Sequence, residues 1–101
     1  MENKTKAVKF GGSSVCDAKR IDNAAKIIAA DSCRRYVTVS APGKRFSGDE
    51  KITNMLYRAF VSTGDDFYSL LEKIKSRFDE IISELAVPVS LDDDFAELLY
   101  A

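Results

Sequence analysis

The segment with the clearest chemical potential is residues 9–14 (KFGGSS), which joins a lysine to two glycines and two serines. Glycines let backbone N–H groups approach an anion without obstruction from a Cβ atom, and Lys9 adds a positive charge. Ser13 adds a hydroxyl that can donate a hydrogen bond or orient a substrate. The segment matches neither the GxxxxGK[ST] nor the GxGxxG pattern. Two interpretations therefore stay open, an anion-binding turn or a tight turn between a strand and a helix.

A second candidate segment, residues 40–43 (SAPG), follows a β-prone run at residues 36–39. The carboxyl ends of neighbouring parallel strands face the same crevice, so we expect Gly12 and Ser40 to lie close together. An ordinary turn after a strand would also explain Ser40. Thr53 opens a later helical segment, where a solvated helix start is an equally good explanation.

Several catalytic and metal-binding classes are excluded by residue content. The chain has no histidine, which removes Ser-His and Cys-His nucleophile pairs. Its two cysteines, Cys16 and Cys33, lack metal-ligand spacing, so we expect two reduced structural thiols and no metal site.

The elements that must position these residues follow a strand, helix, strand order. Residues 7–10 and 36–39 are β-prone, and apolar residues recur at helical spacing between them, at Ala18, Ile21, Ala25 and Ile28. The pattern predicts a helix over residues 15–30, with Ser14 and Asp17 as a capping box. This order predicts a parallel βαβ unit, and therefore an α/β fold.

The rest of the chain alternates a loop with helices. Residues 41–50 show neither helical nor strand periodicity, which predicts a mobile loop with Phe46 as its one apolar anchor. Helical spacing marks residues 52–60, which end near Gly64 as a C-cap, and residues 67–85, which Pro88 closes. A last helix begins at three aspartates, residues 92–94.

Length and charge restrict the function further. A chain of 101 residues with 46% hydrophobic and 31% charged residues fits one domain or part of one. Its net charge of -1 provides no overall positive electrostatic field that would attract nucleic acid. No stretch approaches the roughly 18–20 apolar residues of a membrane span. We expect a cytoplasmic protein. Residues 1–51 hold eleven basic and six acidic side chains, and residues 52–101 hold four and ten, so a phosphate site belongs in the first half.

Four motifs together resemble the N-terminus of the aspartate kinases: residues 8–15 (VKFGGSSV), 20–24 (RIDNA), 37–44 (VTVSAPGK) and 51–57 (KITNMLY). The resemblance implies the amino-acid kinase fold, a three-layer α/β sandwich. It also implies transfer of the ATP γ-phosphoryl group, with Mg²⁺ on the nucleotide, to the β-carboxylate of L-aspartate. That reaction is the first step towards lysine, threonine and methionine.

The resemblance assigns roles to seven residues. Lys9 would be catalytic and stabilise the transferring phosphoryl group, while the amides of Gly11 and Gly12 would hold phosphate oxygens. Ser13 would approach the phosphate or the aspartate. The residues that would line the aspartate site are Ser13, Ser40, Ala41 and Thr53.

Family members run to several hundred residues, so we expect residues 1–101 to be an incomplete N-terminal part of the catalytic domain, without a regulatory domain. Such a part would be inactive alone, would hold no cofactor tightly, and would self-associate through a sheet edge or apolar helix faces. The helix residues expected there are Phe67, Leu70, Ile74, Phe78 and Ile81. Two alternatives are a self-contained, non-catalytic anion-binding module and a helical interaction domain built on residues 67–85.

Overall fold

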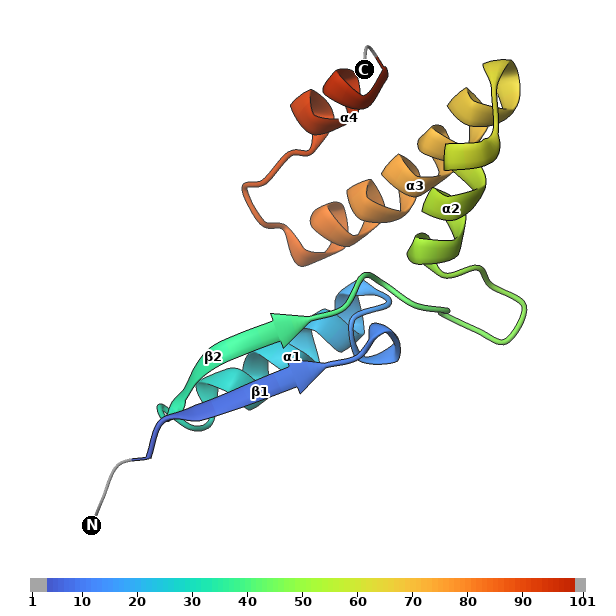
Figure 1. The fold of residues 1–101 in the computed structure, drawn as a ribbon. Helices are drawn as coiled ribbons and strands as arrows, with labels where there is room; N and C mark the ends of the chain where they lie inside the picture. The colour runs from blue at the N-terminus through green and yellow to red at the C-terminus, as the bar shows by residue number, and fades with distance from the viewer. Residues whose placement is uncertain (1–3, 100–101) are drawn as a thin grey trace. The chain divides into compact units, whose positions relative to one another are not determined.

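A computed structural model describes residues 4–99, which form two compact units that meet in sequence between Lys51 and Ile52 (Figure 1). The first unit contains both strands and one α-helix, and the second contains three α-helices. No helix within residues 4–99 combines the length and the apolar character needed to cross a membrane.

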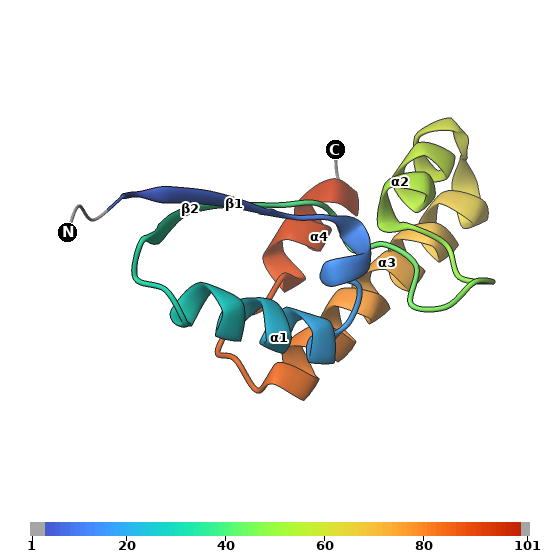
Figure 2. The same ribbon diagram turned by 90° about the horizontal axis from the view of Figure 1, so that it is seen from below.

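The first unit is the predicted parallel βαβ arrangement. Strand β1 (Lys6–Phe10) pairs with β2 (Arg34–Val39), with Lys9 opposite Thr38 and Phe10 opposite Val39. Helix α1 (Ala18–Ala29) connects the two strands and lies along one face of the sheet (Figure 2). The α/β class is therefore confirmed, and both strands begin earlier than their β-prone cores indicate.

The start of α1 differs from the prediction. Residues Gly12–Ser14 form a short 3₁₀ turn, η1, and α1 begins only at Ala18. Its N-cap is Asp17, whose carboxylate accepts a hydrogen bond from the Arg20 amide at 2.9 Å. Serine and aspartate are both good N-caps, so the sequence pattern alone does not choose between Ser14 and Asp17.

The buried face of α1 is also shifted by one position. Ala18 and Ala24 are buried, whereas Ala25 is exposed. Both alanines satisfy helical spacing from Ile21, at i+3 and i+4, so spacing alone does not choose between them.

The second unit consists of α2 (Ile52–Val61), α3 (Gly64–Leu85) and α4 (Asp92–Leu99). Its core joins one side chain or more from each helix: Ile52, Met55, Ile74 and Phe95, with Phe78 and Leu91 packed against them. The amphipathic spacing read from the sequence gives these helices their buried faces.

Two residues in left-handed backbone conformation bound α3. Gly64, the first residue of α3, has φ 60°, a conformation that favours glycine, so it begins α3 instead of capping α2. Ala86 follows the last residue of α3 and has φ 54°. This left-handed conformation is energetically unfavourable for a residue with a Cβ atom.

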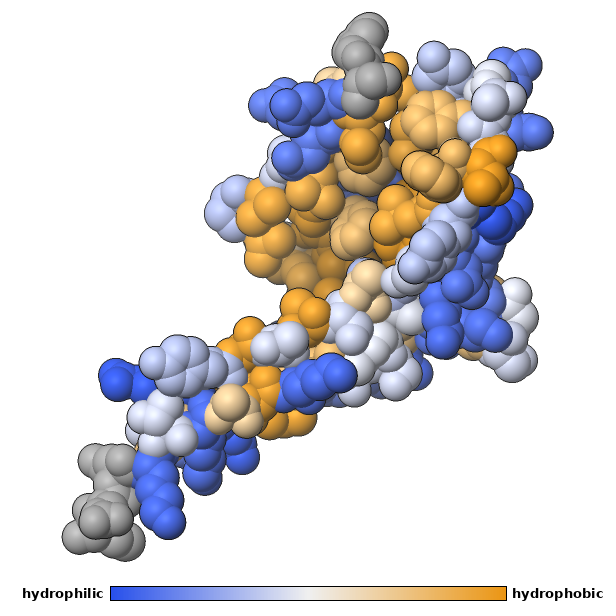
Figure 3. Space-filling view, in the orientation of Figure 1, coloured by the Kyte–Doolittle hydropathy of each residue, from blue (hydrophilic) through white to orange (hydrophobic). Residues whose placement is uncertain are grey.

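The residues expected for self-association are largely buried inside the second unit. Leu70, Ile74 and Ile81 face the unit's own core, because α2 and α4 pack on α3. Large apolar side chains are instead exposed on α2, at Leu56, Tyr57, Phe60 and Val61, and Figure 3 shows apolar surface gathered over the helical unit.

Candidate functional site

The carboxyl ends of β1 and β2 are held together by backbone hydrogen bonds. The Ser40 amide donates to the Phe10 carbonyl at 3.0 Å, and the Gly43 amide donates to the Gly12 carbonyl at 2.9 Å. The predicted proximity of Gly12 and Ser40 is therefore confirmed. Two turns meet at one edge of the sheet, where ligands bind in open parallel sheets.

Gly12 and Gly43 make this meeting possible because neither has a side chain. A Cβ atom on Gly12 would lie 3.0 Å from the Ala41 carbonyl oxygen and 3.2 Å from the Gly43 Cα. A Cβ atom on Gly43 would lie 2.9 Å from the Gly12 carbonyl carbon. A Cβ atom on Gly43 would force the backbone to shift, and a Cβ atom on Gly12 would need its neighbours to move by a few tenths of an ångström, so packing favours glycine at both positions.

Gly11 has different surroundings from these two glycines. A Cβ atom there would meet nothing within 4 Å, and the backbone, with φ −74° and ψ 172°, is one that any residue adopts. Neither packing nor backbone conformation within the described chain requires glycine at this position. The space beside Gly11 is left open to a molecule that approaches the backbone closely.

The donors around this space are unpaired. No acceptor within residues 4–99 receives a hydrogen bond from the Gly12 or Ser13 amide, since the first amides of a helical turn have no partner inside it. Ser13 is exposed, so its hydroxyl is accessible from solvent. The turn therefore presents two amides and a hydroxyl that together suit an anion.

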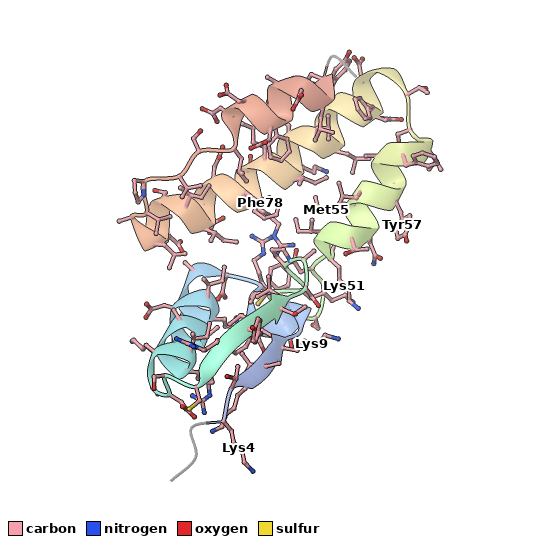
Figure 4. All side chains as sticks on the ribbon, turned by 60° about the vertical axis from the view of Figure 1, so that its left-hand side comes forward. Lys4, Lys9, Lys51, Met55, Tyr57 and Phe78 are labelled. Carbon is pink, nitrogen blue, oxygen red and sulfur yellow. The ribbon has the colours of Figure 1, made fainter. Side chains whose placement is uncertain are left out.

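Lys9 lies three residues before Gly12 in sequence, near the carboxyl end of β1 (Figure 4). Val8 and Phe10 are half-buried and Lys9 is exposed, so the alternation of a strand places Lys9 on the sheet face opposite α1. Its ammonium has no carboxylate partner within the described residues. Lys6, three residues earlier, is paired with Asp31 at 2.6 Å and, with the Cys33 amide, lowers the pKa of Asp31 to about 2.

The amino terminus of α1 contributes less to the site than its position in sequence indicates. Asp17 already caps it, and the Arg20 guanidinium donates to the second Asp17 oxygen at 2.6 Å. The cap carboxylate occupies the positive end of the helix dipole, so the short turn η1 supplies the free amides.

A cavity of about 240 Å³ opens beside the turn, between η1 and α1. Its polar rim includes Arg20 and Asn23, which sequence reasoning did not assign to the site. The signal was available, because both residues belong to the RIDNA motif. The lining residues are Phe10, Ser13, Ser14, Arg20, Asn23, Ala24 and Ile27.

Thr53 belongs to the second unit, where it is exposed in the first turn of α2. The first unit brings together the other six predicted residues: Lys9, Gly11, Gly12, Ser13, Ser40 and Ala41.

No protein-family profile matches this chain. It is 34% identical over 98 residues to aspartokinase 3 of Bacillus subtilis (strain 168), which covers 94% of this chain and 21% of that protein. The crystal structure of Clostridium acetobutylicum aspartate kinase matches with a TM-score of 0.84 and 38% identity, over 93% of this chain and 22% of the other. The crystal structure of E. coli aspartokinase III in complex with aspartate and ADP matches with a TM-score of 0.73 and 28% identity. The match covers 96% of this chain and 20% of the other. The chain thus spans about a fifth of the length of these relatives.

Proposed function

We propose that this chain, a homologue of the aspartate kinases over nearly all of its length, supplies part of the active site for phosphoryl transfer from ATP to the β-carboxylate of L-aspartate. One observation carries the proposal most directly. Unpaired amides at Gly12 and Ser13 lie at the carboxyl edge of a parallel sheet, beside the open position at Gly11. E. coli aspartokinase III was solved with aspartate and ADP, which supports aspartate and an adenine nucleotide as the ligands.

The roles proposed for the residues follow from charge and geometry. The amides of Gly11, Gly12 and Ser13 would hold phosphate oxygens, and Lys9 would stabilise the negative charge that develops on the transferring group. Ser40 and Ala41 would line the adjacent aspartate site, with Thr53 as a further substrate contact. Phosphoryl transfer needs mainly positioning and charge stabilisation, which this set of donors provides.

Mg²⁺ is expected to arrive with the nucleotide. Residues 4–99 include no cluster of three His, Cys, Asp or Glu side chains that could hold a metal ion. When bound, Mg²⁺ would neutralise phosphate charge. No residue of this chain is assigned to it.

The proposal places residues 1–101 within the amino-acid kinase catalytic domain and expects them to be inactive in isolation. About four fifths of the relatives' length lies outside the matched segment, and many powers of ten in rate depend on a complete constellation. Aspartyl phosphate formed by the purified chain, above the level of its Lys9→Ala variant, would contradict this expectation.

The decisive experiment is Lys9→Ala in the full-length kinase. The variant is expected to lower kcat by on the order of 10²–10³ while KM for aspartate changes little, because the lost contact strengthens as phosphoryl charge develops. Lys4→Ala is the matched control, since Lys4 is an exposed lysine just before β1, at the far end from the site (Figure 4). A variant that changes only KM for aspartate would contradict the assigned role.

Two alternatives make different predictions. An anion-binding module would use the same amides, so the 101-residue chain alone would bind inorganic phosphate or ATP tightly. A helical interaction domain would use the exposed α2 side chains, and its folding would depend on a partner and not on Lys9.

A further inference from the structure

Residues 41–50, predicted from composition as a mobile loop, are closed by an internal ion pair. The Arg45 guanidinium donates to both carboxylate oxygens of Asp49, at 2.7 Å from Nε and 3.0 Å from Nη2. The Arg45 amide donates to Asp49 Oδ2 at 2.9 Å, and the Asp49 amide returns a hydrogen bond to the Phe46 carbonyl at 3.0 Å. Phe46, the expected anchor, is 62% exposed, so polar contacts define the loop.

This pair differs from the other ion pairs of the first unit. The side chain of Asp49 is 9% exposed and that of Arg45 is 31% exposed. The Lys26–Asp22 pair has the same i, i+4 spacing, but its side chains are 73% and 54% exposed. Exposed single contacts contribute little to stability, whereas bidentate pairs shielded from water fix geometry.

The closed loop adjoins the glycine contact at the site. Gly43, whose amide donates to the Gly12 carbonyl, lies two residues before Arg45, and Ala41 contacts Gly12 from the same segment. The glycine contact restrains residues 40–43 directly, and the ion pair closes residues 45–49, which follow them after Lys44.

We propose that Arg45 and Asp49 are a positioning pair, which holds residues 40–43 against the glycine turn in the shape that binds aspartate. The proposal rests on the function proposed above. It adds residues that touch neither ligand but set the geometry of residues predicted to do so.

The electrostatics of the pair suit a permanent restraint. Hydrogen bonds from the Arg45 side chain hold the pKa of Asp49 well below its usual range, against the opposing effect of burial. Arginine also stays charged at any ordinary pH. The pair therefore remains intact through the range in which a biosynthetic kinase would work.

The first measurement is hydrogen exchange at the Gly43 amide in the 101-residue chain. Asp49→Ala and Arg45→Ala are expected to reduce its protection at least tenfold, on the order of a lost charge-assisted contact. Asp22→Ala, which breaks the exposed pair of equal spacing, should leave it unchanged. Arg45→Lys keeps the positive charge but loses the two-donor contact of the guanidinium. Protection of the Gly43 amide should therefore be higher in this variant than in the alanine variants, even if those fold poorly.

The second measurement is steady-state kinetics of the full-length kinase. Asp49→Ala should raise KM for aspartate about tenfold and change kcat less, whereas simple loss of folded enzyme would lower kcat alone. Unchanged Gly43 protection in both alanine variants would overturn the restraint. Lost protection with unchanged KM would overturn the positioning role while the Lys9→Ala result stands. If Lys9→Ala has no effect, the proposed function fails, and the exchange result still reports on the loop.

Discussion

At the scale of single residues, three glycines in similar sequence contexts have different reasons to be glycine. Gly12 and Gly43 allow two backbones to touch, whereas Gly11 has no neighbour that a methyl group would meet. Packing therefore accounts for Gly12 and Gly43, and the phosphate contact proposed for Gly11 would account for the third glycine. Sequence identifies the glycine-rich turn but not this division of roles, because it depends on which backbone lies opposite each Cα.

Alanine substitutions should resolve the two roles. Gly12→Ala is expected to destabilise the first unit by roughly 1–3 kcal/mol, because its Cβ would lie 3.0 Å from the Ala41 carbonyl oxygen. Gly11→Ala should fold normally, since its backbone suits any residue, yet its proposed phosphate contact predicts ATP binding about tenfold or more weaker in the full-length protein. Thermal unfolding and ATP titration of both variants provide the measurement. Normal ATP binding by Gly11→Ala would show that the open space is not used by phosphate.

At the scale of elements, the strand-helix-strand order is read correctly from sequence because period and spacing report it directly. The first residue of a helix is harder to predict from sequence. Ser14 and Asp17 are both acceptable caps, and the 3₁₀ turn before α1 includes Gly12, whose carbonyl is bonded to Gly43, a residue distant in sequence. The Arg45–Asp49 pair lies in a loop without periodicity, so the sequence does not reveal the ion pair that closes residues 45–49.

The end of α3 offers a prediction of its own. Ala86 adopts φ 54° directly after the helix, a conformation that costs a residue with a Cβ atom roughly 1–2 kcal/mol. Ala86→Gly should relieve that strain but lose some unfolded-state restriction, for a net stabilisation of about 0.5–1 kcal/mol. Ala96→Gly, at an exposed position inside α4, should instead destabilise the same unit. Urea unfolding midpoints measure both, and a destabilised Ala86→Gly variant would contradict the conformational argument.

At the scale of the whole molecule, the charge boundary of the sequence coincides with the boundary between the two units. Residues 1–51 carry a net charge of +5 from eleven basic and six acidic side chains, and this is the unit with the glycine turn. A positive unit would attract an anionic nucleotide over about a Debye length, in addition to the local contact proposed for Lys9.

The last prediction concerns association of the 101-residue chain. Self-association was expected from sequence, but Leu70, Ile74 and Ile81 are buried, which moves the candidate surface to α2. Leu56, Tyr57, Phe60 and Val61 share one face of that helix, and Phe60 is 87% exposed. Apolar burial contributes about 25 cal/mol per Å², so a few hundred Å² hidden in a self-contact would be worth several kcal/mol before association costs.

Sedimentation velocity at tens of micromolar should therefore show a concentration-dependent species. Phe60→Ser should shift it towards monomer without loss of helix content, because Phe60 lies outside the core of the second unit. Phe46→Ser is the matched control, since Phe46 is exposed on the loop of the first unit. A wild-type chain that stays monomeric would show that the α2 face does not associate, and equal effects of the two variants would show that the contact is not specific to α2.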